Sequence, residues 1–277
     1  MLNKRSGKNF FNTHISSLRF LIIAVSLFVS IVTISAKEPF VYRPKYPQYD
    51  NLKYGVPGPA DTIIEREGYA LGYIEKHEQP SWVCYIVTKD ELSSRVAKRT
   101  NNFREDPLIP TGSAHPSDYT RSGFDRGHLA PAADMSFSQK TMSDSFFMSN
   151  MSPQKPAFNR GIWGKLEKQI RYFANREGMI VVVTGPILPK TPTITIGRNK
   201  VSVPEYYYKV VYDLTPPQKM IGFILPNKGS SEDLLSFAVT VDHVEKLTGL
   251  DFFSLVPKQK QEKLESSISV ESWDWIN

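Results

Sequence analysis

Apolar runs along the chain predict five β-strands. Each run is rich in β-branched or aromatic residues and is bounded by Gly, Pro, Asn or Asp, and the runs occupy 69–76, 82–89, 179–188, 205–214 and 219–227. The last two are separated by the turn-forming segment LTPPQK. We therefore expect those two strands to pair antiparallel.

Helical periodicity is found in fewer segments. Residues 159–178 carry apolar side chains at helical spacing and end at Gly178; the stripe consists of Ile162, Leu166, Ile170 and Phe173. Residues 231–249 begin at a Ser cap followed by acids and predict one or two helices. Because strands and helices do not alternate regularly, the pattern favours an α+β fold with an antiparallel central sheet flanked by helices.

The first 36 residues are typical of a targeting segment. Residues 1–19 contain four basic residues and no acid, and residues 20–36 form one apolar block without charge. This order predicts a secretory signal peptide cut near Ala36, and hence an exported protein, periplasmic or secreted. The alternative is an uncleaved anchor that holds the protein on a membrane through residues 20–36, although the block is shorter than the roughly 20 residues that span a bilayer. A mitochondrial presequence is less favoured, because the segment is not an Arg-rich amphipathic helix.

Charge and cysteine content narrow the class of protein. The whole chain has a formal net charge of +6, but taking four basic residues from 34 leaves 30 against 28 acids once residues 1–36 are set aside. Affinity for nucleic acid must then come from a local basic patch. Cys84 is the single cysteine, so no intrachain disulfide can form. We expect a Pro/Tyr-rich arm at 37–67, a domain at 68–257 and a charged, solvated helical tail at 258–277.

The candidate chemistry begins at Asp125-Arg126-Gly127-His128. A histidine takes up a proton near neutral pH, and a neighbouring arginine offers a fork of donors for phosphate oxygens. Gly127 permits close approach of the backbone, and Asp125 is available to hold the loop or to orient a cation. Taken alone, the string is also consistent with a solvated turn that happens to contain a histidine.

A second group of polar residues follows within the next 43 positions. Asn159 stands at the start of the predicted helix, where a capping role is the ordinary interpretation. Glu167 and Arg171 are four residues apart on that helix, a spacing also typical of a surface ion pair. Together with His128 and Arg126 they supply a base, a neutral oxygen ligand, a carboxylate and two guanidinium groups. Oxygen ligands that leave most places to water suit Mg²⁺, and the set is fit for phosphodiester hydrolysis.

Three blocks of sequence, DRGHLAPAADM, FFMSNMSPQ and FNRGIWGKLEKQIR, together resemble the DNA/RNA non-specific endonuclease family in order and spacing. That family includes secreted bacterial nucleases and mitochondrial endonuclease G. The resemblance runs from about Gly68 to Pro257 and takes in NNFREDP and VEKLTGLDFF. It implies a ββα-metal (His-Me finger) active-site motif and hydrolysis of DNA and RNA, without sequence selectivity, to 5′-phosphate products.

The resemblance also implies a role for each matching position. His128 would be the general base that activates water, and Asn159 would be the one side chain directly on the metal. Glu167 would orient the water shell of the ion, and Arg126 and Arg171 would neutralise phosphate charge. The remaining implied roles concern the surroundings of these groups: Asn150 would position the His128 loop, and Asp125 and Gly127 would support the motif. An upstream arginine would face the phosphate; both Arg99 and Arg104 lie near the right place, and Arg99 is favoured.

Cofactor and partners follow from the same resemblance. Mg²⁺ is the expected ion, with Mn²⁺ as a substitute, and DNA and RNA are the expected substrates. A homodimer is a further expected partner, because dimers are common in the family. An inhibitor protein is also among the expected partners. Two alternatives stay open: a degenerate nuclease-like domain that only binds nucleic acid, and a phosphodiesterase of the same fold that acts on small substrates.

Overall fold

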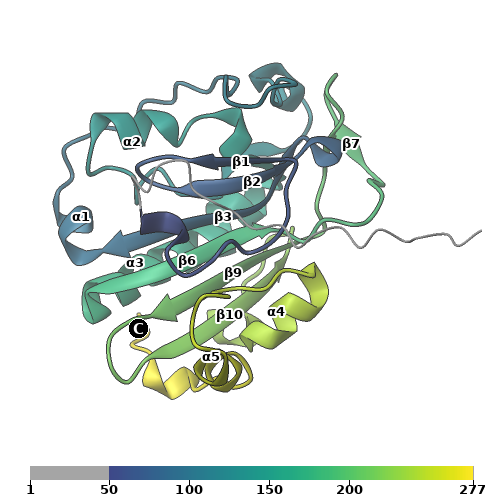
Figure 1. Cartoon of the computed structure of the whole chain (residues 1–277). Helices are drawn as coiled ribbons and strands as arrows, with labels where there is room; N and C mark the ends of the chain where they lie inside the picture. The colour runs from purple at the N-terminus through teal and green to yellow at the C-terminus, as the bar shows by residue number, and fades with distance from the viewer. Residues whose placement is uncertain (1–49, 277) are drawn as a thin grey trace, which may run out of the picture. The chain divides into compact units, whose positions relative to one another are not determined.

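A seven-stranded antiparallel sheet forms the centre of the computed structural model, which describes residues 50–276 (Figure 1). The strand order is β1-β2-β3-β6-β9-β10-β11. Their bounds are β1 (Thr62–Glu65), β2 (Ala70–Ile74), β3 (Gln79–Thr88), β6 (Met179–Pro186), β9 (Tyr206–Asp213), β10 (Lys219–Pro226) and β11 (Ala238–Val239). All five predicted strands are present, and β9 and β10 pair antiparallel, with Lys219 opposite Asp213.

The middle strands are buried on both faces, which explains why their sequences are continuous apolar runs rather than alternating ones. On one face, α3 (Gly164–Glu177) packs its apolar stripe against side chains of β3, β6 and β9. On the other face lie α4 (Val241–Thr248) and α5 (Lys258–Glu265), which Figure 1 shows on the side of the sheet away from α3. The sheet is therefore a rigid support between two apolar layers.

The helix predicted at 159–178 begins differently from a regular α-helix. Its first residues form a π-helical turn, Phe158–Trp163, in which Gly161 leaves helical geometry with φ −102° and ψ −111°. Helix α3 then continues to Glu177, and Gly178 ends it with a φ of +87° that favours glycine. The prediction is confirmed in extent, and the wide first turn is a new feature.

A second, two-stranded sheet lies directly before α3 in the chain. It pairs β4 (Asp125–His128) with β5 (Met151–Gln154) antiparallel. Two strands followed by a helix form the ββα unit. The other elements are α1 (Lys89–Ser93), α2 (Gln139–Asp144), the β7 (Thr195–Ile196) and β8 (Val201–Ser202) hairpin, and the short turns η1 (Asp50–Leu52), η2 (Glu75–His77), η3 (Pro116–Tyr119), η4 (Met148–Asn150), η6 (Leu234–Phe237) and η7 (Val270–Ser272).

The ends of the predicted domain carry more structure than the sequence indicates. Strand β1 lies inside 37–67, the range of the predicted Pro/Tyr-rich arm, and it pairs with β2 through four residues. In the segment 231–249 a single helix, α4, follows a short turn and β11. The boundaries at 68 and 257 stay predictions. The targeting segment 1–36 lies outside the described residues, and within 50–276 there is no helix long and apolar enough to cross a membrane.

The C-terminal tail is anchored on α3. The α5 helix is present as predicted, but the tail beyond it is not simply solvated, because Trp273 is buried against Phe173 with ring centroids 4.6 Å apart. The Gln169 amide also donates to the carbonyl of Asp274 at 2.9 Å. The tail therefore packs on the helix that carries Glu167 and Arg171.

Replacing Trp273 with Ala removes a buried aromatic side chain and leaves a cavity beside Phe173. We expect the free energy of unfolding to fall by about 3–5 kcal/mol, measured by chemical denaturation. The matched control is Ile276→Ala in the same tail, where the side chain is 38% exposed and the change should stay within about 0.5 kcal/mol. Equal effects of the two substitutions would contradict this packing.

Candidate active site

Strand β4 separates the motif residues onto its two faces. Arg126 and His128 both reach the ring of Phe103: the Arg126 guanidinium carbon lies 4.4 Å from its centroid and the His128 ring 5.8 Å. Between them, a Cβ at Gly127 would lie 2.2 Å from the side chain of Gln154, so only glycine fits there. The alternative interpretation of this string as a solvated turn is therefore excluded.

His128 is held neutral in an aromatic enclosure. Its side chain is only 8% exposed and meets Phe146 edge to face, with centroids 4.8 Å apart. Burial, with a further contribution from the charge of Arg99, lowers the pKa of His128 to about 3. Its Nε2 atom is buried and has no hydrogen-bond partner among residues 50–276. A neutral imidazole is the form that accepts a proton.

Asn150 fixes the chain that follows His128. Its side-chain oxygen accepts a hydrogen bond from the Ala130 amide at 2.9 Å, and its Nδ2 donates to the carbonyls of Ala130 and Ser145 at 3.0 and 2.9 Å. The backbone of Leu129 also donates to the Asn150 carbonyl at 3.1 Å. These are the contacts that the predicted positioning role requires, and Asn150 is completely buried.

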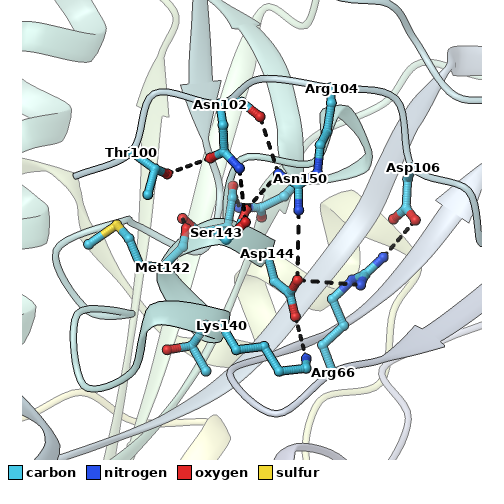
Figure 2. Close-up of polar contacts among 12 residues, drawn as sticks. Arg66, Thr100, Asn102, Arg104, Asp106, Lys140, Met142, Ser143, Asp144 and Asn150 are labelled. Carbon is cyan, nitrogen blue, oxygen red and sulfur yellow. Dashed lines mark hydrogen bonds and ion pairs between the residues drawn. The ribbon is translucent and has the colours of Figure 1, made fainter. Parts of the chain in front are cut away.

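A buried ionic network lies beside Asn150 (Figure 2). Arg66 reaches Asp106 at 2.6 Å and Asp144 at 3.9 Å, and its guanidinium carbon lies 4.0 Å from the Phe147 ring centroid. Arg104 lies 3.7 Å from the same centroid and donates to the Ser143 carbonyl. The network joins the loop after β1 to α2 and leaves Arg104 occupied by protein partners.

The two candidate upstream arginines, Arg99 and Arg104, lie in different surroundings. The Arg99 guanidinium carbon lies 4.9 Å from the centroid of Phe146, the ring that also packs on His128. The charge of Arg99 acts on both His128 and Glu167. The structure thus brings Arg99 to the site and keeps Arg104 in the network of Figure 2. Contact of Arg99 with phosphate stays a prediction.

Asn159 is tied to β4 rather than to the helix backbone. Its Nδ2 donates to Asp125 Oδ2 at 2.9 Å, and the helical turn has no side-chain cap. Asp125 also accepts hydrogen bonds from Arg160 at 2.9 and 2.7 Å. Because the amide nitrogen is occupied, the orientation of the amide is fixed and its Oδ1 remains available as an oxygen ligand. A fixed neutral oxygen is a donor that Mg²⁺ accepts, so the residues fit the expected ion.

Glu167 and Arg171 do not pair with each other in the described residues, so the surface-pair interpretation is wrong. Arg171, 19% exposed, instead bonds the buried Asp134 at 2.8 Å. Glu167 is half-buried on the same side of α3. Burial raises the pKa of its carboxyl, and the ammonium of Lys209 is the main opposing charge.

Sequence reasoning missed Asp134, Lys209, Phe103 and Phe146. Asp134 lies in the quoted DRGHLAPAADM block, so proximity to the motif was an available signal. Lys209 gave none, because a single lysine in YYYKVVYD is ordinarily a solvent-facing position of a strand. It is in fact completely buried.

A β4–β5 pair followed by a helix, with a neutral histidine on the strand and an oriented amide at the helix start, defines a ββα-metal nuclease. The model of the DNA/RNA non-specific endonuclease family matches residues 48–259. The chain belongs to this family. The α+β fold with its ββα motif is confirmed, and so is the prediction, at the level of the family, of a metal-dependent endonuclease.

Known relatives cover most of the chain. The mitochondrial nuclease of Saccharomyces cerevisiae is 36% identical over 236 residues, which are 77% of this chain and 72% of the relative. Human endonuclease G is 36% identical over 72% of each chain. Nuclease C1 of Cunninghamella echinulata var. echinulata is 37% identical over 73% of this chain and 86% of its own. A chain in a crystal structure of the EndoG/EndoGI complex superposes with a TM-score of 0.69 at 31% identity, over 76% of this chain and 92% of that chain.

These relatives correct the prediction of export. The nucleases of Saccharomyces cerevisiae and Schizosaccharomyces pombe and human endonuclease G are named as mitochondrial, which points to mitochondria rather than to a periplasmic or secreted protein cut near Ala36. The physical reason is that residues 1–36 are basic, acid-free and rich in serine, as mitochondrial presequences also are. The apolar block 20–36 received too much weight.

Replacing Asn150 with Asp tests the hydrogen bonds of its side chain with Ala130 and Ser145 without changing side-chain size. A carboxylate oxygen then faces the carbonyls of Ala130 and Ser145 and cannot donate to them. We expect a loss of about 2–3 kcal/mol of unfolding free energy, measured by denaturant titration. The control Asn102→Asp changes an exposed amide with one side-chain acceptor, Ser143 Oγ at 2.9 Å, and should lose far less.

The lowered pKa of His128 makes stability depend on pH. The imidazole of His128 protonates near pH 6.5 in the unfolded chain and only near 3 in the folded one. Its contribution to the free energy of unfolding is therefore complete above pH 6.5 and is lost as the pH falls toward 3. Between pH 8 and 5 it amounts to about 2 kcal/mol. When the pH is lowered from 8 to 5, the free energy of unfolding of His128→Leu should therefore fall by about 2 kcal/mol less than that of the parent. The measurement is thermal unfolding at each pH. The control His243→Leu, at an exposed position, should follow the parent.

Proposed function

We propose that the protein is a Mg²⁺-dependent endonuclease that hydrolyses phosphodiester bonds of DNA and RNA without sequence selectivity, leaving 5′-phosphate ends. The single observation that carries the proposal is the neutral, buried His128 beside two guanidinium groups, those of Arg99 and Arg126. Family membership supports it. We assign the activity to residues 68–257.

In this proposal His128 takes the proton of the attacking water. Burial lowers the pKa of His128 and so favours the neutral imidazole, the form that accepts a proton. Arg126 lies over the Phe103 ring and Arg99 over the Phe146 ring, which pack edge to face on each other. Both would offer their charge to the phosphate. Asn150 keeps the chain after His128 in register.

Asn159 would hold the ion through Oδ1, with its amide fixed by Asp125, and Glu167 would accept hydrogen bonds from the surrounding water shell. When bound, Mg²⁺ supplies charge stabilisation for the leaving 3′-oxygen. The side chain of Arg171 stays partly exposed while Asp134 binds its Nη1 atom, and in this proposal the guanidinium also contacts the phosphate. Mn²⁺ has the same preference for oxygen ligands and should replace Mg²⁺.

Every residue of the proposed set is assigned to the phosphate, the ion or water, and this assignment supports low sequence selectivity. Phosphate contacts position the substrate but carry no base information. DNA and RNA are therefore both proposed as substrates, with binding that weakens as salt concentration rises. A homodimer and an inhibitor protein are proposed as further partners, the second because a solved relative is named as a complex with EndoGI.

The test is digestion of supercoiled plasmid and of RNA by the full chain, with Mg²⁺ and then with EDTA. We expect cleavage of both substrates, loss of cleavage in EDTA, and 5′-phosphate ends. His128→Ala should lower the rate at least about 10³-fold while it keeps folding and nucleic-acid binding. Plasmid cutting by His128→Ala at the parental rate would exclude this residue as the base.

The same assay, with a dinucleotide added as a third substrate, distinguishes the two alternatives from an endonuclease. A degenerate binding domain would retain plasmid without cutting it at any Mg²⁺ concentration. A phosphodiesterase for small substrates would turn over a dinucleotide faster than long DNA. Either outcome overturns the proposal of an endonuclease.

A further inference from the structure

Lys209 is a buried cation that the proposed mechanism does not use. It lies in the middle of β9, paired with Thr184 of β6 and Phe223 of β10, and its side chain is 0% exposed. Its Nζ has one hydrogen-bond partner in the described residues, the Tyr85 hydroxyl at 3.4 Å. Burying an ammonium with a single long contact is expensive unless opposite charges lie nearby.

The opposite charges come from the active-site helix and from the loop after β4. Lys209 Nζ lies 4.7 Å from the Trp163 ring centroid. Trp163, Glu167 and Arg171 follow each other at intervals of four residues, so they share one side of the helical segment. Arg171 in turn bonds Asp134 at 2.8 Å. Lys209 thus lies beneath the side of α3 that presents Glu167.

The charges of this cluster balance. When ionised, Asp134 and Glu167 contribute two negative charges, and Arg171 and Lys209 contribute two positive ones. Tyr85 is the other titratable group that faces Lys209, and burial keeps it protonated by raising its pKa well above the ordinary value. Arg99 acts on Glu167 from the solvent side. Asp134 Oδ2 is buried without a hydrogen-bond partner in the described residues, and the charges of Arg171 and Lys209 favour the ionised form of its carboxyl.

We propose that Lys209 is a positioning residue of the active site: its ammonium is the internal counter-charge that favours the ionised forms of both carboxylates, Asp134 and Glu167, beneath the catalytic surface. Arg171 alone balances only one of them. Without Lys209, the cluster would bury a net negative charge, and Glu167, the less well paired carboxylate, would take up a proton. A protonated Glu167 accepts fewer hydrogen bonds and no longer matches the water shell of a cation.

This inference rests on the proposed function for its catalytic consequence, but its charge balance can be measured without metal or substrate. The ¹³C carboxyl resonance of Glu167, assigned by comparison with Glu167→Gln, reports its protonation in the metal-free full-length chain. In Lys209→Met the midpoint of that titration should rise by about one pH unit or more. Cleavage at pH 7 should fall about tenfold and recover at pH 9.

The control variant is Lys219→Met. Lys219 is another lysine of the sheet, on β10, and forms conventional ion pairs with Glu177 at 2.8 Å and Asp213 at 3.0 Å. Its loss should lower stability but leave the Glu167 titration and the pH profile unchanged. Lys209→Gln, which retains a polar end, gives the same test if the Met variant does not fold.

A double variant tests the balance directly. Lys209→Met combined with Asp134→Asn removes one positive and one negative charge, and should bring the Glu167 midpoint and the pH profile back toward those of the parent. An unchanged midpoint in Lys209→Met or Lys209→Gln overturns the inference, and so does a double variant no closer to the parent than the single one. A parent protein that cuts neither plasmid nor RNA would instead overturn the proposed function, and the carboxyl titration would still decide the role of Lys209.

Discussion

The hydrogen bond between Asn159 and Asp125 is the constraint on which the candidate site depends. It ties the start of the helical segment to the first residue of β4, and His128 is the last residue of that strand. The two predicted chemical groups, an imidazole and an amide oxygen, are thereby held by one short strand. Arg160 strengthens the tie by binding both oxygens of Asp125. A small displacement of β4 would move the base and the ligand together, and their mutual geometry would be preserved.

The large sheet supplies the second requirement, a low-dielectric support below polar side chains. Strands β3, β6 and β9 are covered on both faces of the sheet, and α3 packs directly on one of these two faces. In such surroundings charges act strongly on one another, because water does not screen them. This explains how a histidine stays neutral on the small sheet while Asp134 and Lys209 lie next to the charged side of α3 that carries Glu167 and Arg171. Polar groups so deep in a domain are more consistent with a functional origin than with a gain in stability.

Much of this architecture could be predicted from the sequence, and the failures have physical causes. The continuous apolar runs identified the five main strands, and Gly178 identified the end of α3, because burial on two faces and a left-handed cap both leave local signatures. Strand β1 escaped notice because four residues, TIIE, are too few for periodicity. The motif blocks made His128 and Asn159 candidates, but no local pattern indicated Lys209. Its environment is created by α3, which lies more than 30 residues before it in the chain.

The π-helical turn from Phe158 to Trp163 has a consequence for how this chain can vary. Each residue of a regular α-helix turns the following side chain by about 100°. The turn therefore sets the angular offset between Asn159, at its beginning, and Glu167, one turn beyond its end. Removal of one residue from it would rotate the carboxylate away from the amide while leaving both side chains in the sequence. The spacing of eight positions between them should thus be less tolerant of insertion or deletion than any loop at the rim of the sheet.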